Sequence, residues 1–203
     1  SGNLMENARD ARHKLLCDFC LEHNIPYLFL GHTLDDQIET FFINLERGSG
    51  IDGLSAMDEI TLRDGIYICR PLLGTKKEDI RNYLRFLNQE WIDDPTNENE
   101  RFLRVKIRKL FQDDQLFFDR INLAISNLKR AKNFIKNHTS EIYNQIVNSE
   151  LIGIKHFDQT AFSQINEELR LRLLNQVLEE NSPQQKKRRL ESVQRLDQLI
   201  ISN

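Results

Sequence analysis

Residues 25–47 constrain the fold most, because an apolar run leads directly into a charged loop and then a helical pattern. The run IPYLFLG, residues 25–31, is short, continuous and bounded by proline and glycine. Such a run predicts a strand buried on both faces, as in a parallel sheet. A helical spacing of apolar residues precedes it over residues 4–23, and another follows over residues 35–47. Helix, buried strand, charged loop and helix in this order predict an open α/β sheet.

The loop after this strand is rich in ionisable groups, since His32, Asp35, Asp36 and Glu39 fall within eight residues. In open α/β sheets, ligands bind beyond the carboxyl ends of the strands. Asp35 and Glu39 are one helical turn apart and therefore share a face. Acidic residues at a helix start also complement the helix dipole. The segment is thus either a ligand site or an ordinary charged helix start.

Downstream, Asp64-Gly65 between β-prone residues indicates a hairpin within residues 61–73. Thr75 and Glu78 predict a capping box for a helix over residues 76–90. From Arg101 onward the pattern is helical, with one long helix marked by apolar residues from Ile121 to Ile146, either continuous or broken near His138. The remaining expected elements are a loop with a short strand over 150–166 and helices over 169–178 and 190–201.

Composition and charge set limits on the class of protein. With 39% hydrophobic residues the chain can bury a core. No apolar run is long enough to span a bilayer and no signal peptide opens the chain, so we expect a cytoplasmic protein without membrane contact. Residues 1–118 carry 15 Lys or Arg against 21 Asp or Glu, a net charge of −6, whereas residues 119–203 carry 13 against 10, a net of +3. This asymmetry favours a catalytic domain over 1–118 joined to a domain over 119–203 that contacts a polyanion.

The three cysteines do not suggest a disulfide framework, because their number is odd. Cys17 and Cys20 form a CxxC motif without a second pair, and both lie on or near the apolar face of the first predicted helix. We interpret them as small hydrophobic packing residues. A metal or redox role is the alternative.

Four sequence blocks together resemble a known family. GHTLDDQIET followed by LERGSGIDGLSAM is similar to the second signature block of the tRNA(Ile)-lysidine synthetases, which belong to the PP-loop ATP pyrophosphatases. GNLMENARDAR lies upstream, and RPLL and WIDDPTNENERFLRVKIR follow in the family's order, over about 110 residues. The resemblance implies an α/β fold: the remainder of a parallel-sheet PP-loop (adenine nucleotide alpha hydrolase-like) domain, followed by an α-helical tRNA-contacting domain.

The family pattern begins with a strand and an SGGxDS loop that cradles the ATP phosphates, and this sequence contains no such motif. A strand-helix-strand unit takes about 30 residues. We therefore expect the chain to be a partial copy that lacks two or more units of the sheet, and we expect the catalytic interpretation to apply to the intact protein.

The resemblance implies an enzyme that ligates lysine to C2 of the wobble cytidine in the CAU anticodon of isoleucine tRNA. The product is lysidine, and the intermediate is an adenylated tRNA. The implied cofactors are ATP and Mg²⁺. The implied partners are isoleucine tRNA, free lysine as substrate, and a second copy of the chain in a homodimer.

The family pattern also assigns roles to individual residues. Asp36 is the expected catalytic carboxylate and Mg²⁺ ligand, and His32 and Arg104 are the other expected catalytic residues. The expected ATP-binding or supporting residues are Asp35, Glu39, Arg47, Gly48, Gly50 and Arg70. For Arg47-Gly48-Ser49-Gly50 the alternative is a helix C-cap by Gly48. Thr33 stands where the family often has a second histidine, and Val105 stands where it usually has asparagine.

Basic residues form two candidate RNA-binding clusters. They are Arg101 and Arg108 in the first, and Lys186, Lys187, Arg188 and Arg189 in the second. Contacts of such residues to phosphates are independent of base sequence and sensitive to salt. Their ordinary alternative is a solvated helix surface. Two rival functions are a PP-loop tRNA thiolase, which would use catalytic cysteines, and a non-catalytic RNA-binding remnant.

Overall fold

The computed structural model describes residues 4–92, 115–149, 154–181 and 190–202 of the 203-residue chain. By its internal contacts the chain divides into one unit of residues 1–129 and a second of residues 130–203. The division falls within helix α6 (Gln115–Ile146). The boundary expected near residue 118 lies in the same helix, and as a domain boundary it stays a prediction.

A three-stranded sheet organises the first unit, with strand order β1-β3-β2. β1 (Tyr27–Phe29) runs parallel to β3 (Ile66–Cys69), and β2 (Ile60–Arg63) runs antiparallel to β3. The predicted hairpin is confirmed. Asp64 and Gly65 form its two-residue turn, both with positive φ (51° and 81°), which is the backbone that tight hairpins require.

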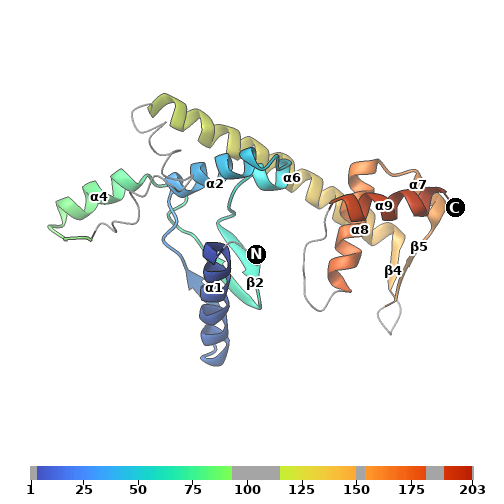
Figure 1. Cartoon of the computed structure of the whole chain (residues 1–203), viewed down its shortest axis with the longest axis horizontal. Coiled ribbons are helices and arrows are strands. Elements are labelled where there is room, and N and C mark those ends of the chain that lie inside the picture. Colours follow the sequence, from blue (N-terminus) through green and yellow to red (C-terminus); the bar gives the residue numbers. More distant parts are fainter. Residues whose placement is uncertain (1–3, 93–114, 150–153, 182–189, 203) are drawn as a thin grey trace. The chain divides into compact units, whose positions relative to one another are not determined.

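Helix α1 (Leu4–Glu22) packs against one side of this sheet, and Figure 1 shows it beside the strands. Its contact residues are Cys17 and Cys20, which are buried with Ile66 and with half-buried Leu28. The expectation that both cysteines are packing residues therefore fits the structure. By contrast, Leu15 and Phe19 of the same helix are exposed, because the side of α1 that meets the sheet is the cysteine side.

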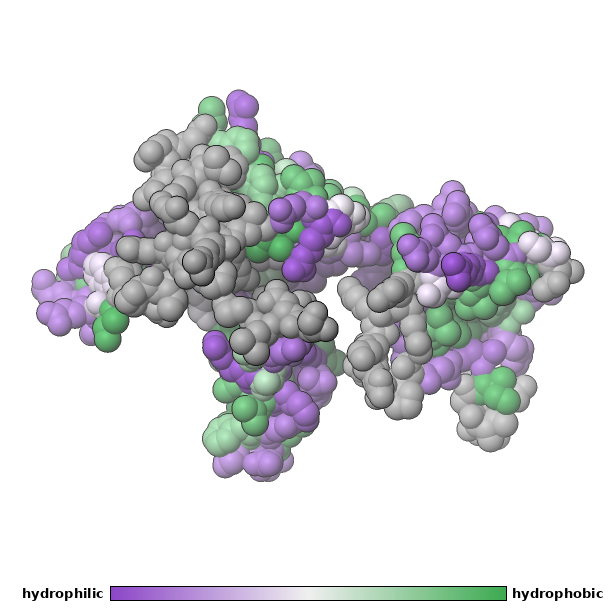
Figure 2. All heavy atoms as spheres, viewed as in Figure 1, coloured by the Kyte–Doolittle hydropathy of each residue, from purple (hydrophilic) through white to green (hydrophobic). Residues whose placement is uncertain are grey.

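The other side of the sheet is exposed in the described residues. The paired strands place five large apolar side chains there: Tyr27, Phe29, Ile60, Leu62 and Tyr67, all exposed. In Figure 2, hydrophobic residues lie on the surface among hydrophilic ones around α1 and β2. The expectation that residues 25–31 are buried on both faces was wrong for this chain, since among the described elements only α1 covers β1.

Helix α2 (Leu34–Glu46) confirms the helix predicted over residues 35–47. It packs on α6 in the first unit, as Figure 1 shows, and its buried Leu34, Ile38 and Phe41 meet Ile125. Short helix α3 (Ile51–Leu54) follows, and α4 (Lys77–Phe86) follows the hairpin. Tyr83 on α4 is exposed, so α4 packs less tightly than its apolar spacing suggests.

The second unit combines helices with a small hairpin. Its elements are the end of α6, β4 (Val147–Ser149), β5 (Lys155–Phe157), α7 (Gln159–Ser163), α8 (Glu167–Glu180) and α9 (Leu190–Ser202). β4 and β5 pair antiparallel, with Val147 opposite Phe157. The predicted long helix is confirmed and has no break near His138, because α6 continues to Ile146. Of the described helices, none is both long enough and apolar enough to cross a membrane.

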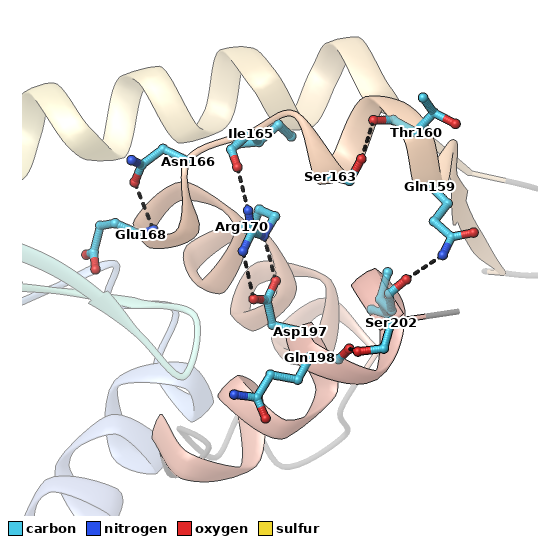
Figure 3. A network of polar contacts seen from close by, with 11 residues as sticks. Gln159, Thr160, Ser163, Ile165, Asn166, Glu168, Arg170, Asp197, Gln198 and Ser202 are labelled. Atoms are coloured by element: carbon cyan, nitrogen blue, oxygen red, sulfur yellow. Dashed lines mark hydrogen bonds and ion pairs between the residues drawn. The ribbon is translucent and has the colours of Figure 1, made fainter.

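The core of this unit surrounds Phe162, Leu173 and Val193, all fully buried. Beside this core, an ion pair between Arg170 and Asp197 joins α8 to α9 (Figure 3). Arg170 donates from Nε and Nη2 to the two carboxylate oxygens of Asp197, at 2.8 and 3.0 Å. Because the fork of Arg170 matches both oxygens, this pair fixes the angle between the helices as well as their distance.

A second polar group joins the hairpin to the helices. Glu180 accepts hydrogen bonds from the hydroxyl of Tyr143 and from Lys155 Nζ, the latter at 2.9 Å. Burial acts to raise the pKa of Glu180, but the bonds from Tyr143 and Lys155 outweigh it and hold that pKa below its ordinary value of 4.5. The bond to Glu180 and, second, an interaction with the Tyr143 hydroxyl raise the pKa of Lys155.

This lowered pKa predicts that the second unit loses stability at low pH, which we call the acid limb of its stability. A carboxylate with a lowered folded-state pKa contributes stability above its unfolded pKa and loses it as the pH falls through the folded value. The urea concentration at the midpoint of unfolding should therefore decrease as the pH falls below 4.5. Glu180→Gln should flatten that limb, while Glu179→Gln, which leaves the bonds from Tyr143 and Lys155 to Glu180 in place, should not. An unchanged acid limb in Glu180→Gln would contradict the role of this carboxylate.

Candidate active site

The carboxyl ends of β1 and β3 lie side by side, because these strands are parallel neighbours in the sheet. Phe29 pairs with Cys69, and the N–H of Leu30 donates to the Cys69 carbonyl at 2.8 Å. The loops that leave the two strands are joined again where the N–H of Leu34 donates to the carbonyl of Thr75 at 2.9 Å. One edge of the sheet therefore carries several predicted site residues: His32, Asp35, Asp36 and Arg70.

Asp36 sits in the first turn of α2 and caps its own helix. Its Oδ2 accepts from the backbone N–H of Thr33 at 2.8 Å and from the Thr33 hydroxyl at 3.0 Å. Both bonds run to Oδ2, and among the described residues neither of them involves Oδ1. The Asp36 side chain is half-buried. Thr33, at the position where the family often has a histidine, thus holds the carboxylate in place.

Asp35 points to a different helix. Its Oδ2 accepts from the backbone N–H of Lys77, the first residue of α4, at 2.8 Å. The N-cap residue Lys76 makes no side-chain cap of its own. The predicted capping box of Thr75 and Glu78 was therefore wrong, because a carboxylate 42 residues earlier satisfies the first turn of α4. A local pattern could not reveal such a partner.

Glu39 is only 2% exposed and is one of the most deeply buried polar residues of the first unit. Burial of an ionised carboxylate is costly unless polar groups compensate it. Asp35 and Asp36 are only half-buried, so a ligand reaches them more easily than it reaches Glu39. A supporting role for Glu39 beside the nucleotide stays a prediction.

The RGSG turn ends α2 in the way that the alternative interpretation expected. Gly48 has φ +67°, and its N–H donates to the Leu45 carbonyl at 3.0 Å. The N–H of Ser49 donates to the backbone carbonyl of Asn44 at 2.9 Å, which completes a Schellman motif. These two N–H groups are therefore occupied by the helix and do not face an anion. Arg47 is exposed, Gly50 is the N-cap of α3, and nucleotide contact by either stays a prediction.

Gln37 is a residue of this region that the sequence analysis missed. It is buried, and its carboxamide makes two hydrogen bonds with the backbone of Met57. Nε2 donates to the Met57 carbonyl at 2.8 Å, and Oε1 accepts from the Met57 N–H at 2.7 Å. Gln37 therefore fastens the end of the RGSGIDGLSAM segment to the acid-bearing helix. Its place between Asp36 and Ile38, among residues singled out for other reasons, was the only available signal.

Loss of this amide pair is expected to destabilise the first unit. In Gln37→Leu both Met57 peptide groups lose their partners, so the free energy of unfolding should fall by about 2–3 kcal/mol. Gln37→Glu keeps the acceptor but buries a carboxylate opposite the Met57 carbonyl, so it should be destabilised as well at neutral pH. Urea denaturation measures both effects, with Gln89→Leu, an exposed glutamine whose amide bonds the neighbouring Glu90 carbonyl, as the matched control. Equal losses in Gln37→Leu and Gln89→Leu would contradict the role of Gln37.

Arg70 leaves the end of β3 and is half-buried. Its Nη1 donates to the Asp58 carbonyl at 2.9 Å and to the Thr61 hydroxyl at 3.0 Å. These bonds hold the segment that enters β2. A contact between Arg70 and phosphate stays a prediction.

Some predicted residues lie outside the described part of the chain. They are Arg101, Arg104, Arg108, Lys186, Lys187, Arg188 and Arg189.

The described residues can be compared with what Mg²⁺ requires. Among them, no three His, Cys, Asp or Glu side chains converge as a metal cage. Mg²⁺ is usually held by one or two carboxylates together with substrate phosphates. A half-buried carboxylate whose recorded hydrogen bonds all go to one of its two oxygens, as in Asp36, fits that kind of site.

The cysteines occupy a different environment. Burial raises the pKa of the Cys17 thiol, and the negative charge of Asp64 acts in the same direction. A thiol with a raised pKa is a weak nucleophile and a weak metal ligand at neutral pH. Cys17 and Cys20 lie between α1 and the sheet, not in the loops that carry His32 and Asp36.

Comparison with known proteins gives consistent matches. The model of the PP-loop domain matches residues 1–114. The tRNA(Ile)-lysidine synthase of Wolbachia pipientis wMel is 38% identical over 176 residues, which cover 85% of this chain and 41% of that protein. The enzyme of the same name from Orientia tsutsugamushi (strain Boryong) is 34% identical, over 97% of this chain and 46% of that protein. That from Rickettsia bellii (strain OSU 85-389) is 31% identical, over 98% and 46%.

The chain thus spans less than half the length of these curated relatives. Among solved structures, the U34-tRNA thiolase NcsA from Methanococcus maripaludis with its [4Fe-4S] cluster aligns with a TM-score of 0.50 and 16% identity. The alignment covers 63% of this chain and 44% of the thiolase chain. At this sequence identity the similarity supports the fold alone. The family match, the mixed sheet and the predicted α/β class agree: this chain belongs to the PP-loop family.

Proposed function

We propose that the full-length protein containing this chain is an ATP-dependent ligase that converts the wobble cytidine of isoleucine tRNA (CAU anticodon) to lysidine. The observation that carries the proposal is similarity over at least 85% of the chain to three proteins named tRNA(Ile)-lysidine synthase. The position of GHTLDDQIET at the carboxyl end of β1 supports it, because ligands of open α/β sheets bind there.

The reaction has two balanced steps. The O2 oxygen of the cytosine attacks the α-phosphorus of ATP and pyrophosphate leaves, which gives the adenylated tRNA. The ε-amine of free lysine then attacks C2 and forms the new C–N bond. The bond between C2 and O2 breaks, AMP leaves with that oxygen, and the amine loses a proton. Mg²⁺, when bound, would neutralise phosphate charge in the first step.

Asp36 is the residue on which the proposal depends most. Its Oδ2 is held by Thr33, so its position is fixed before any ligand arrives. We assign Oδ1 to Mg²⁺ or to the lysine ammonium. His32 and Arg104 are assigned to the developing phosphoryl and cytosine oxygens, because a guanidinium suits planar oxygen acceptors. The supporting nucleotide-binding residues of the proposal are Asp35, Glu39, Arg47, Gly50 and Arg70, and Gly48 supports them through the turn that its positive φ allows.

For the tRNA, the proposal retains the basic residues Arg101, Arg108, Lys186, Lys187, Arg188 and Arg189. The same proposal includes free lysine as substrate, association of two copies of the protein and a cytoplasmic location. Each of these follows from the family resemblance.

The direct test incubates the full-length protein with ATP, lysine and unmodified isoleucine tRNA. Release of AMP with formation of lysidine supports the ligase. If AMP does not appear and the cytidine stays unmodified, the ligase proposal fails. Retained tRNA binding in that case would favour the alternative, a non-catalytic RNA-binding protein.

A PP-loop tRNA thiolase is the rival enzyme, and the cysteines distinguish it. A thiolase needs reactive cysteines, whereas Cys17 and Cys20 are buried packing residues. We expect Cys17→Ala combined with Cys20→Ala in the full-length protein to leave lysidine formation within about twofold of the unmodified enzyme under conditions where both are folded. The measurement is AMP release at saturating ATP and lysine. Loss of turnover with a native circular dichroism spectrum would favour the thiolase.

A further inference from the structure

One helix of the structure combines positive charge with exposed aromatic rings. Between Asp119 and Glu141, α6 contains no acidic residue. The same stretch contains five basic residues: Arg120, Lys129, Arg130, Lys132 and Lys136. A run of one charge sign on a helix attracts a polyanion, and nothing in the family motifs accounts for it.

Within the second unit, an aromatic pair lies on this helix. The rings of Phe134 and His138 stack with centroids 6.0 Å apart and planes 15° apart. Phe134 is 71% exposed, although it belongs to a helix whose other side is packed. Arg130, Phe134 and His138 follow at intervals of four residues, so they share one face. We name these three residues the α6 stripe.

The opposite side of α6 identifies the stripe as the outward face. Thr139 and Tyr143 are buried, and Tyr143 belongs to the core of the second unit. Lys136 is exposed, but two residues after Phe134 it projects from nearly the opposite side of the helix. Glu141 closes the stripe, with its Oε2 3.4 Å from His138 Nδ1. Apart from Glu141, the ionisable groups of α6 between residues 130 and 141 are basic.

The chemistry of the stripe fits single-stranded RNA. Arg130 lies one helical turn before the Phe134 ring on the same face of α6. Unpaired bases stack on aromatic side chains, and Arg or Lys beside the ring neutralise the flanking phosphates. A lone exposed Phe needs no explanation. A Phe stacked on an imidazole within an acid-free basic run matches this mode of recognition.

We propose that the α6 stripe is an RNA-binding site that stacks an unpaired base against Phe134 and contacts phosphate through Arg130. The identity of the RNA as isoleucine tRNA rests on the proposed function, but the stacking site does not. The site adds to the basic clusters over residues 101–108 and 186–189.

The test measures binding of the 203-residue chain to three fluorescently labelled RNAs: a short single strand, the same sequence as a duplex, and unmodified isoleucine tRNA. Phe134→Ala should weaken binding of the single strand and of the tRNA about tenfold, because a base stack is lost. Phe134→Tyr should restore it. The duplex should be insensitive, since its bases are not available to the ring. Arg130→Gln should weaken all three and reduce the salt dependence by about one ion.

Leu199→Ala on α9 is the matched control, because Leu199 is 63% exposed and lies on another helix. It should leave RNA binding unchanged, and thermal melting should show that every variant is folded. Equal affinities of Phe134→Ala and the unmodified chain for the single strand would overturn the proposal. So would a loss of self-association in Phe134→Ala without a loss of RNA affinity, since the stripe would then join copies of the chain.

Failure of this inference and failure of the ligase proposal are distinguishable. If the full-length protein forms lysidine and its Phe134→Ala variant has the same KM for tRNA, the proposed RNA-binding role of the α6 stripe is wrong and the ligase proposal is supported. If no lysidine forms but Phe134→Ala still loses single-strand binding, the stripe stands and the ligase fails.

Discussion

Replacing Asp36 by asparagine in the full-length protein is expected to abolish lysidine formation while leaving the fold and tRNA binding nearly intact. Asparagine keeps an oxygen that accepts from the N–H and hydroxyl of Thr33, so the start of α2 keeps its cap. It removes the negative charge that we assign to Mg²⁺ or the lysine ammonium. Loss of such an electrostatic contact should lower kcat by a factor of about 10² or more.

The measurement is AMP release and lysidine formation, together with tRNA affinity and a urea melt. Asp36→Ala should be equally inactive and should also lose about 1 kcal/mol of stability, because the cap is removed. Asp79→Asn, an exposed acid in the first turn of α4, is the control and should retain activity. If Asp36→Asn turns over normally, or if it loses tRNA binding along with activity, Asp36 is structural.

The second large effect is expected in the second unit, where Asp197→Ala leaves Arg170 without its ionic partner. The two side chains are only 6% and 13% exposed, so the pair is nearly buried. Removal of one partner from such a pair costs about 3–5 kcal/mol, because the remaining charge stays desolvated. Arg170 keeps one bond, from Nη1 to the Ile165 carbonyl at 2.7 Å, and this should place the loss near the lower value.

Urea denaturation followed by circular dichroism measures this loss. Glu168→Gln is the matched control on the same helix, because its partner is Arg172 at i+4 and Glu168 is exposed. Exposed helix pairs contribute only about 0.3–0.5 kcal/mol. The double change Arg170→Met with Asp197→Leu should recover much of the loss, since no charge is left buried. A loss in Asp197→Ala no larger than that in Glu168→Gln would mean that the pair does not fasten α8 to α9.

Elements specified by neighbouring residues were predictable from the sequence. The Asp64-Gly65 turn fixes the β2–β3 hairpin because both residues adopt positive φ. The helices near residues 4–23, 35–47, 169–178 and 190–201 follow from apolar spacing and are confirmed with boundaries shifted by a few residues. The end of α4 was placed too late, because Leu87 caps the helix and Asn88 has φ +52°.

Burial was less predictable, because it depends on which elements cover a surface. The apolar run 25–31 reads as a strand with two covered faces, yet Tyr27 and Phe29 are exposed. In α1, hydrophobicity alone favours Leu15 and Phe19 as contact residues. The smaller Cys17 and Cys20 face the sheet instead, where their size suits close packing against Ile66.

The candidate site was predictable in its location but not in its internal connections. The motif placed His32, Asp35 and Asp36 at the end of a parallel strand, and the structure has them there. The separate tasks of the two aspartates depend on the backbone 42 residues downstream and on the cap residue Thr33. The amide pair of Gln37 joins residues 20 positions apart, which no local pattern encodes.

The adjacent aspartates also make the lengths of two loops interdependent. Asp36 fixes where α2 begins and Asp35 fixes where α4 begins, and the backbone bond from Leu34 to Thr75 sets the spacing between these starts. A residue inserted after β1 would displace the cap of α4, and one inserted before Lys77 would displace the partner of Asp35. The Asp64-Gly65 turn carries no such constraint from the site. Within this family fold, changes in chain length are therefore better tolerated at the far end of the hairpin than at the sheet edge that bears the acids.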